Sequence, residues 1–223
     1  MDYRFELTGT MPILMHQDDV MAADVLNEWR KSPSNKSVSV PGDDRSPAWT
    51  WMSCLYHDGT HLAMPWGPIM ACLRGAGSKI PAKRGSFKSM TQSGMLIPSD
   101  YCEFTVGGKQ IALADIEAFK DARFSAHIAE CRKLGFDLLV KRAKIGTSKH
   151  VRVRPQFQGW RISGTIGVTE PAITTEVLEQ LFQIAGRLIG LGDWRPSAPQ
   201  SPGPYGMFRS SIEPVSSKTR KAS

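Results

Sequence analysis

The first residues alternate strictly between apolar and polar side chains. Tyr3, Phe5 and Leu7 fall on one side of an extended chain, and the residues between them are polar. A period of two is typical of a half-buried strand, and Gly9 marks its end. Further β-prone runs predict strands at 48–55, 61–64, 101–106, 109–113, 136–144 and 207–212.

Apolar residues at helical spacing predict four helices. The second of them carries Ile69, Cys72, Leu73 and Ala76 on one side, which is the pattern of a half-buried helix. Between this helix and the next strand, 79–94 is basic and irregular, and we expect a protruding loop there. The predicted helices cover 22–31, 68–77, 115–134 and 174–190.

The segment 150–168 predicts a β-hairpin whose two-residue turn is Gln158-Gly159. When the two strands pair with each other across this turn, one face of the hairpin is apolar throughout. The opposite face then collects Arg152, Arg154 and Arg161. A slip of one residue would bury these arginines, so a single register satisfies both faces.

The order of the predicted elements is strand, helix, strands, hairpin, helix and strand. We interpret it as an α+β fold with a ferredoxin-like (RRM-like) β-α-β-β-α-β core that carries large insertions. A single domain would cover 1–213, with insertions at about 10–47 and 79–149. The polar and basic residues 214–223 would form a disordered tail.

A glycine- and proline-rich loop, 190–206, lies between the last predicted helix and the last strand. Its prolines prevent a helix from continuing, and its glycines allow the backbone to approach a ligand or another segment closely. A loop of this length in a compact chain is usually functional or disordered. Because it also holds Asp193, Trp194, Arg195 and Tyr205, we interpret it as a binding loop.

The charge of the chain points to an anionic partner. Its formal net charge is +7 and its pI is about 9.4, as is common in proteins that bind nucleic acid. No apolar run approaches the roughly 20 residues of a membrane span, nothing resembles a signal peptide, and the four cysteines form no CxxC pair. We therefore expect a cytoplasmic protein with reduced thiols and no membrane partner.

Positive charge is concentrated between 132 and 161, where nine Lys or Arg residues stand against one acid. Arginine suits phosphate through its planar fork of donors, and aromatic rings can stack on bases. We expect single-stranded RNA or DNA as the ligand, and a solvated sheet face without a ligand is the competing interpretation. The candidate binding residues are Arg74, Lys79, Lys83, Arg84, Lys88, Lys141, Arg142, Lys144, Lys149, His150, Arg152, Arg154, Arg161, Trp194 and Arg195.

The run from His57 to Ala76, HDGTHLAMPWGPIMACLRGA, resembles the start of RAMP-superfamily proteins of CRISPR systems. In that superfamily a similar run ends a strand and opens the first core helix. Here the residues in comparable places are Asp58-Gly59, Pro65, Gly67, Leu73 and Arg74. The second marker of the superfamily is a glycine-rich loop between the last core helix and the last strand, which is the position of 190–206.

The chain departs from the family pattern in two respects. Pro68, Ile69 and Met70 replace the serine pair and lysine of the family helix, and the glycine-rich loop is unusually rich in proline. By length and order of elements the chain resembles the backbone subunits of this superfamily. This resemblance implies that the chain binds RNA and that copies of it assemble along the strand. It also implies that the chain joins other subunits in a ribonucleoprotein complex for antiviral defence in a prokaryotic cell. A solitary phage or mobile-element version with another nucleic-acid role is equally compatible.

Two other functions stay open. A phage or mobile-element structural protein would use its basic charge for assembly. Some backbone subunits of the resembling family cleave bound RNA with an acid from the loop before the Asp-Gly motif, and Asp43 or Asp44 falls in a similar place. An endoribonuclease using either acid is therefore an alternative, although Gly-Asp-Asp is also ordinary turn chemistry.

No cofactor or metal ion is expected. Cys54, His57, His61 and Cys72 are residue types that zinc accepts. Alternation along the predicted strand separates Cys54 from His57, however, and Cys72 belongs to the buried side of its helix. The sequence also lacks the Walker, Gly-x-Ser-x-Gly and His-Glu-x-x-His motifs.

Overall fold

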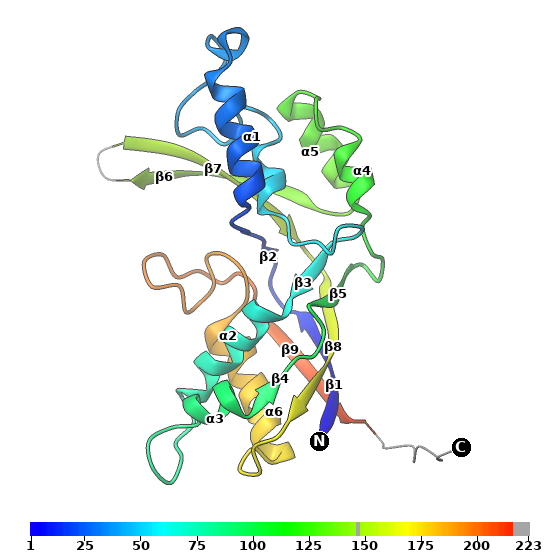
Figure 1. The fold of residues 1–223 in the computed structure, drawn as a ribbon, viewed down its shortest axis with the longest axis vertical. Helices are drawn as coiled ribbons and strands as arrows, with labels where there is room; N and C mark the ends of the chain where they lie inside the picture. Colours follow the sequence, from blue (N-terminus) through cyan, green and yellow to red (C-terminus); the bar gives the residue numbers. More distant parts are fainter. Residues whose placement is uncertain (146–147, 216–223) are drawn as a thin grey trace.

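The computed structural model describes residues 1–145 and 148–215, and for 144, 145, 148 and 149 it describes the backbone alone. Helices and antiparallel strands are mixed in this part of the chain, which confirms the α+β interpretation. Figure 1 shows a larger sheet with its helices in the lower half and a smaller sheet with further helices in the upper half. No helix of the described residues is long and apolar enough to cross a membrane.

The larger sheet is antiparallel, and its strand order is β3-β5-β8-β1-β9, with the short β4 also paired to β8. In the middle of the sheet, Leu7 lies opposite Ile162 on one side and Ser210 on the other. The strands are β1 (Asp2–Gly9), β3 (Ala63–Pro65), β4 (Met95–Leu96), β5 (Tyr101–Val106), β8 (Trp160–Val168) and β9 (Phe208–Pro214).

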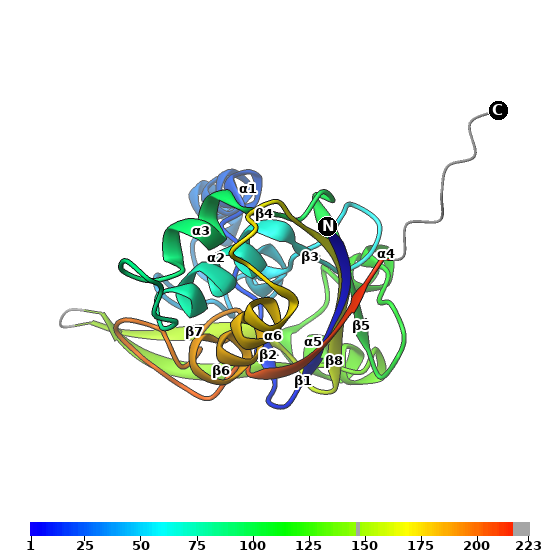
Figure 2. The same ribbon diagram turned by 90° about the horizontal axis from the view of Figure 1, so that it is seen from below.

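Two helices, α2 (Trp66–Gly77) and α6 (Thr175–Ile184), cover one face of the larger sheet, as Figure 2 shows. The side chain of Thr174 caps α6 by accepting a hydrogen bond from the Val177 amide. Phe5 of β1 packs on Phe182 of α6, with their ring centroids 5.5 Å apart. The alternating residues of β1 therefore supply the core between sheet and helices, as predicted.

The helix predicted over 174–190 is α-helical only as far as Ile184. After α6, a π-helical turn runs over Ala185–Ile189, and it places Gly186 directly against Phe208 of β9. Gly186 has no side chain, so the helix and the last strand can approach this closely. The chain then leaves the turn at Gly190, where φ is +75°.

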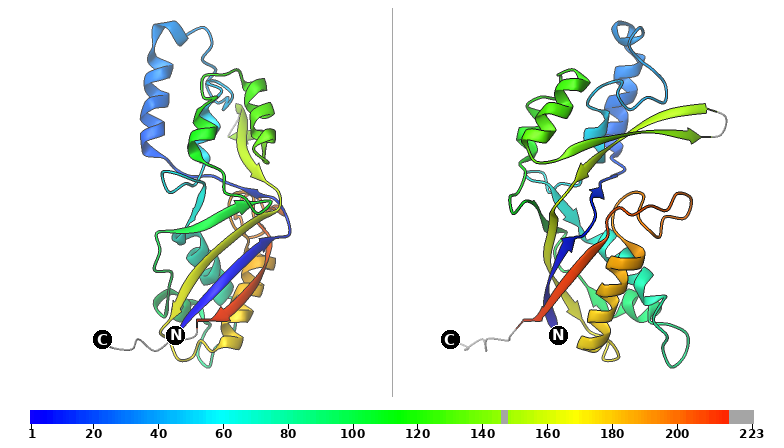
Figure 3. Two further views of the ribbon diagram at one scale, coloured as in Figure 1. Left: turned by 90° about the vertical axis from the view of Figure 1, so that its right-hand side faces the viewer. Right: turned by 180° about the vertical axis from the view of Figure 1, so that it is seen from behind.

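The smaller sheet has the order β2-β7-β6 and lies at the opposite end of the molecule from α6. Figure 3 shows α1 and the pair α4–α5 rising at this end, away from the larger sheet. The elements of this part are β2 (Ile13–Leu14), α1 (Val20–Lys31), a 3-10 turn (Pro33–Asn35), α4 (Leu113–Glu117), α5 (Phe124–Lys133), β6 (Asp137–Ile145) and β7 (Ser148–Phe157).

The predicted hairpin at 150–168 is wrong in its pairing. Both of its strands form, but β7 pairs with β6 and β2, whereas β8 pairs with β1 and β5. Trp160, at the junction, is buried, and its indole N–H donates to the Met11 carbonyl at 2.8 Å. Each strand buries its apolar side in a different sheet. Alternation predicts which side chains are buried, but it does not identify the neighbouring strand.

Four other predicted elements differ from the structure. The strand predicted over 109–113 does not form, since Lys109 and Ala112 make only isolated bridges and Leu113 begins α4. The run 48–55 forms a 3-10 turn (Thr50–Cys54) instead of a strand, and the buried Trp51 of this turn donates its indole N–H to His127 at 2.9 Å. The helix predicted over 115–134 is two helices, α4 and α5. The basic loop after α2 contains a short helix, α3 (Lys88–Ser93).

Candidate functional site

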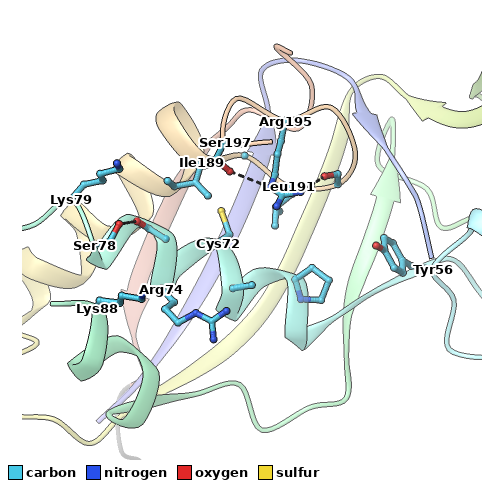
Figure 4. A pocket seen from close by; sticks show the side chains of 15 residues that line it. Tyr56, Cys72, Arg74, Ser78, Lys79, Lys88, Ile189, Leu191, Arg195 and Ser197 are labelled. Atoms are coloured by element: carbon cyan, nitrogen blue, oxygen red, sulfur yellow. Dashed lines mark hydrogen bonds between the residues drawn. The ribbon is translucent and has the colours of Figure 1, made fainter. Parts of the chain in front are cut away.

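A groove of about 560 Å³ lies between α2 and the first part of the glycine-rich loop. Figure 4 shows its side chains, which come from both of these walls and from α3. Among the described residues that line the groove there is no Asp or Glu, while four are cationic. These four are Arg74, Lys79, Lys88 and Arg195. The groove is therefore electrostatically complementary to an anionic ligand.

The α2 wall follows from the amphipathic pattern of the helix. Ile69, Leu73 and Ala76 are buried against the sheet, so the other side of the helix faces the groove with Arg74 and, at the helix end, Ser78. Cys72 lines the floor of the groove, and burial raises the pKa of its thiol to about 12. The thiol is thus protonated and unreactive at neutral pH.

The opposite wall is the loop that begins at Gly190. Gly190 and Gly192 both have φ of +75°, a conformation that glycine adopts without strain. Gly192 contacts the carbonyl oxygen of Leu14 so closely that a Cβ atom would collide with it. The next residue, Asp193, donates its amide hydrogen to the same carbonyl at 2.9 Å. These contacts hold the loop against β2.

Arg195 extends from this loop toward α2 (Figure 4). Its guanidinium donates to the Gly192 carbonyl at 3.1 Å and to the Ser197 hydroxyl at 3.2 Å. No acid lies within 4.0 Å of this guanidinium among the described residues. The loop therefore orients a positive charge into the groove without neutralising it.

A buried network of charged groups lies beside the loop and centres on Arg154 of β7, which is 8% exposed. Its guanidinium donates to Asp44 at 3.3 Å and to Asp193 at 3.0 Å, and it lies 3.3 Å from a ring nitrogen of His16. Asp44 also accepts from Arg152 at 2.9 Å. This network joins β7, the loop before the 3-10 turn and the glycine-rich loop.

The arginine face predicted for the hairpin does not form. Arg152 and Arg154 pair with Asp44, and Arg154 is buried. Arg161 lies in the other sheet, exposed, with its guanidinium 3.7 Å from Glu6. The acids that permit Arg154 to be buried are distant in the sequence, so a register argument confined to 150–168 could not include them.

The remaining candidates from the smaller sheet do not line the groove. The ammonium group of Lys141 lies 4.2 Å from the ring centroid of Trp194, and Arg142 is exposed. His150 packs against Gly42. The side chains of Lys144 and Lys149 lie outside the described residues. In contrast, the predicted basic loop does reach the groove, because Lys79 and Lys88 line it and the exposed Lys83 and Arg84 lie between them in the sequence.

Asp43 and Asp44, the candidate catalytic acids, are both occupied by protein groups. Asp43 accepts from the Arg45 side chain at 2.9 Å and 2.6 Å, and this hydrogen bonding lowers its pKa. The two oxygens of Asp44 accept from Arg152, Arg154 and the Val153 amide. A carboxylate with a lowered pKa is a weak general base, and neither acid lines the groove.

No group of three or more His, Cys, Asp or Glu side chains is placed to hold a metal ion in the part of the chain that the structure describes. Cys72 lies in the floor of the groove, while Cys54 is near Arg154. His57 and His61 belong to the turn around Asp58.

Several groove residues were absent from the predicted set. Tyr56, Ser78 and Ser197 add hydroxyl groups to the lining, and Tyr56 donates to the His16 carbonyl at 3.0 Å. Isolated serines and a tyrosine outside a motif carry no usable sequence signal. The Gly-x-Gly at 190–192, directly after an amphipathic helix, was the one local signal of a close backbone approach.

No family model matches the chain, and a search of curated proteins finds no match. The observations that bear on function are therefore the geometry and the charge of the groove.

Proposed function

We propose that this chain binds single-stranded nucleic acid, with RNA as the expected ligand, and that copies of it assemble along the strand without cleaving it. The groove between α2 and the glycine-rich loop would hold the phosphate backbone. Its four cations and the absence of lining acids among the described residues are the observation that carries this proposal. Phosphate contacts of this kind supply most of the affinity of non-specific binding.

The arrangement of the larger sheet supports a ferredoxin-like core. Along the chain, β1, α2, β5, β8, α6 and β9 follow a β-α-β-β-α-β order. In space their strands are arranged as β5-β8-β1-β9, so the first and third strands of this unit are central and all neighbours are antiparallel. The smaller sheet and α1 would then be insertions into this core.

The two segments that resemble the RAMP superfamily form the two walls of one groove. The run that ends in Arg74 becomes β3 and α2, and the loop after α6 supplies Arg195. They are more than one hundred residues apart in the sequence. Their meeting at a basic groove supports membership of that superfamily, and this membership is part of the proposal.

The dimensions of the groove favour a single strand. A volume of about 560 Å³ is in the range of a small-ligand site, which is enough for a short single-stranded segment. Tyr56 can stack on a base. Hydroxyl groups of Ser78 and Ser197 can bond to the ribose 2′-OH, which distinguishes RNA from DNA.

The surface of α1 supports assembly in repeated copies. None of its residues is buried, and Val20 and Met21 are each 74% exposed. Contiguous exposed apolar side chains often mark an interaction surface. A neighbouring copy on the same strand would cover them.

Fluorescence anisotropy with labelled single-stranded RNA, single-stranded DNA and duplex tests the proposal. We expect Arg74→Gln to weaken RNA binding about tenfold or more, because a hydrogen bond to a charged group contributes about 1.5–3 kcal/mol. Arg74 has no acidic partner within 4.0 Å among the described residues, so its loss should leave folding intact. On longer RNAs, light scattering should show a stepwise increase in bound copies.

The matched control is Arg4→Gln. Arg4 is exposed on β1 and alternates with Tyr3 and Phe5, so it lies on the face of the sheet that α2 and α6 leave uncovered. We expect it to bind RNA as the unchanged protein does. Weaker binding by Arg4→Gln alone would move the site to the open sheet face, and no binding of any strand at low salt would contradict the proposed function.

A further inference from the structure

A second hollow, of about 350 Å³, lies between α1 and β7. Arg30 of α1 lines it from one side and Arg152 of β7 from another. Asp18, which precedes α1, and Trp49, which precedes the 3-10 turn Thr50–Cys54, also line it. Lys120 packs on the Trp49 ring, with its ammonium group 5.3 Å from the centroid, but does not line this hollow.

Not all of the polar groups of this hollow are satisfied by one another. The Nε atom of Arg30 is buried and has no hydrogen-bond partner. Arg152 uses one terminal nitrogen on Asp44, and its side chain is still 31% exposed. Asp18 is exposed, and no ion pair within 4.0 Å joins it to either arginine in the described part of the chain. A buried donor without a partner costs about 1–3 kcal/mol, which a ligand would relieve.

The mixture of charges decides what kind of ligand fits. The groove beside α2 has cations and no lining acid among the described residues, whereas this hollow combines three arginines (Arg30, Arg152 and Arg154) with three acids (Asp18, Asp19 and Asp44). A phosphate would meet the three carboxylates as well as the arginines, so the hollow suits a phosphate less well than the groove does. A nucleobase presents acceptors for arginine, donors for a carboxylate and a flat face for an aromatic ring.

The hollow and the groove share two short stretches of chain. Asp193 contacts Arg154 in the wall of the hollow, and two residues further on Arg195 lines the groove. Likewise Cys54 lines the hollow and Tyr56 lines the groove. Two residues span at most about 7 Å. The two sites are therefore neighbours along the chain, and a base pocket requires that a base of the strand in the groove reaches across these residues.

We propose that this hollow is a base pocket, which takes one nucleobase of the strand whose backbone lies in the groove and selects it by its edge. The inference rests on the proposed function and adds a source of sequence preference to it. Phosphate contacts in the groove position the strand, and contacts to the base edge specify it. Asp18 accepts from the base, Arg30 and Arg152 donate to it, and Trp49 stacks on its face.

The test compares affinities for four single-stranded RNAs of about 12 nucleotides, a length within the usual site sizes. Each RNA contains a single type of base, which is A, C, U or 7-deazaguanine. The unchanged protein should prefer one of them. Asp18→Asn should weaken binding of the preferred RNA about fivefold to 100-fold and leave the other three nearly unchanged. Asp24→Asn, which removes the same charge from an exposed position on α1 outside the pocket, should keep the preference.

The direction in which Asp18→Asn changes the affinity distinguishes base recognition from general electrostatic attraction. Removing an acid from a protein that binds phosphate strengthens its binding of every strand, so a loss of affinity for one base has a different origin. Equal affinity for all four RNAs, or a uniform gain in both Asp variants, overturns the base pocket and leaves the groove in place. Absence of binding to any strand overturns both proposals.

Discussion

Arg154 is buried without being left unpaired. Its guanidinium contacts Asp44, Asp193 and the Val153 carbonyl. An isolated buried charge would be strongly unfavourable, and the paired arrangement offsets that cost. Its two acidic partners come from segments on either side of β7 in the sequence, so the arginine joins three parts of the chain. Its contact with Asp193 holds the glycine-rich loop against β7, and in the proposed function the groove cations contact the ligand.

Truncation of Arg154 should destabilise the fold. Arg154→Gln leaves Asp193 without a guanidinium partner and Asp44 with Arg152 alone, and the loss of one member of a buried pair costs about 3–5 kcal/mol. Urea denaturation followed by circular dichroism measures the change. Arg161→Gln is the control, because Arg161 is exposed and 3.7 Å from Glu6, and it should change the free energy of unfolding by less than about 0.5 kcal/mol. Equal effects of the two substitutions would contradict the assignment.

At the scale of elements, close backbone contacts hold the glycine-rich loop in place. Leu191 donates its amide hydrogen to the Gly206 carbonyl at 3.0 Å, and Gly206 donates to the Pro12 carbonyl at 2.7 Å. Both ends of the loop therefore hydrogen-bond within a few residues of β2. The positive φ of Gly192 lets the chain turn there toward the groove.

A side chain at Gly192 should displace this loop. In Gly192→Ala the new Cβ meets the Leu14 carbonyl oxygen, in addition to the strain of about 1–2 kcal/mol for an alanine in the left-handed region. Gly108→Ala is the matched control, since φ is +80° there and no atom lies within 4 Å of the added Cβ.

We expect thermal unfolding to show a smaller loss of stability for Gly108→Ala than for Gly192→Ala. Only the latter should also weaken RNA binding, because Gly192 lines the groove. An unchanged affinity in Gly192→Ala would mean that the loop does not form a wall of the binding site.

At the scale of the whole molecule, the net charge of +7 is unevenly placed. The arginines of β7 are paired with Asp44 and Asp193. The groove cations Arg74, Lys79, Lys88 and Arg195 have no acid within 4.0 Å among the described residues. The positive field should therefore be strongest at the groove.

Four unpaired cations predict a definite salt dependence. Each phosphate contact of a single strand contributes about −0.7 to the slope of log K against log salt concentration, so four contacts give a slope of about −3. Affinity should then fall about 50-fold between 50 mM and 200 mM salt. Arg74→Gln should reduce the slope by about 0.7, which anisotropy titrations at several salt concentrations can resolve. A slope near zero would exclude phosphate binding in this groove.

Part of the candidate site was accessible from the sequence. Arg74, Lys79, Lys88 and Arg195 were all among the predicted binding residues. Lys79, Lys88 and Arg195 lie in basic or glycine-rich segments that are locally unusual, and Arg74 lies in the run that resembles the RAMP superfamily. Their meeting in one groove was not predictable from local pattern, since α2 and the glycine-rich loop are brought together by packing on the same sheet. The hydroxyl groups that join them carry no local signal.

The sequence by itself determined which apolar side chains of β1 and α2 are buried. The alternation at Tyr3, Phe5 and Leu7 and the stripe of α2 appear as predicted, because burial of an apolar face depends on the local period of the backbone.

Only the tertiary structure decided which strand pairs with which, and where the arginines of β7 find their partners. Strand pairing depends on the free energy of all possible neighbours, and β8 has β1 and β5 available to it as well as β7. Arg154 reaches an acid 110 residues away in the sequence and another 39 residues away. A local pattern contains no record of contacts at such separations, so Arg154, which looked like part of a binding surface, proved to be structural.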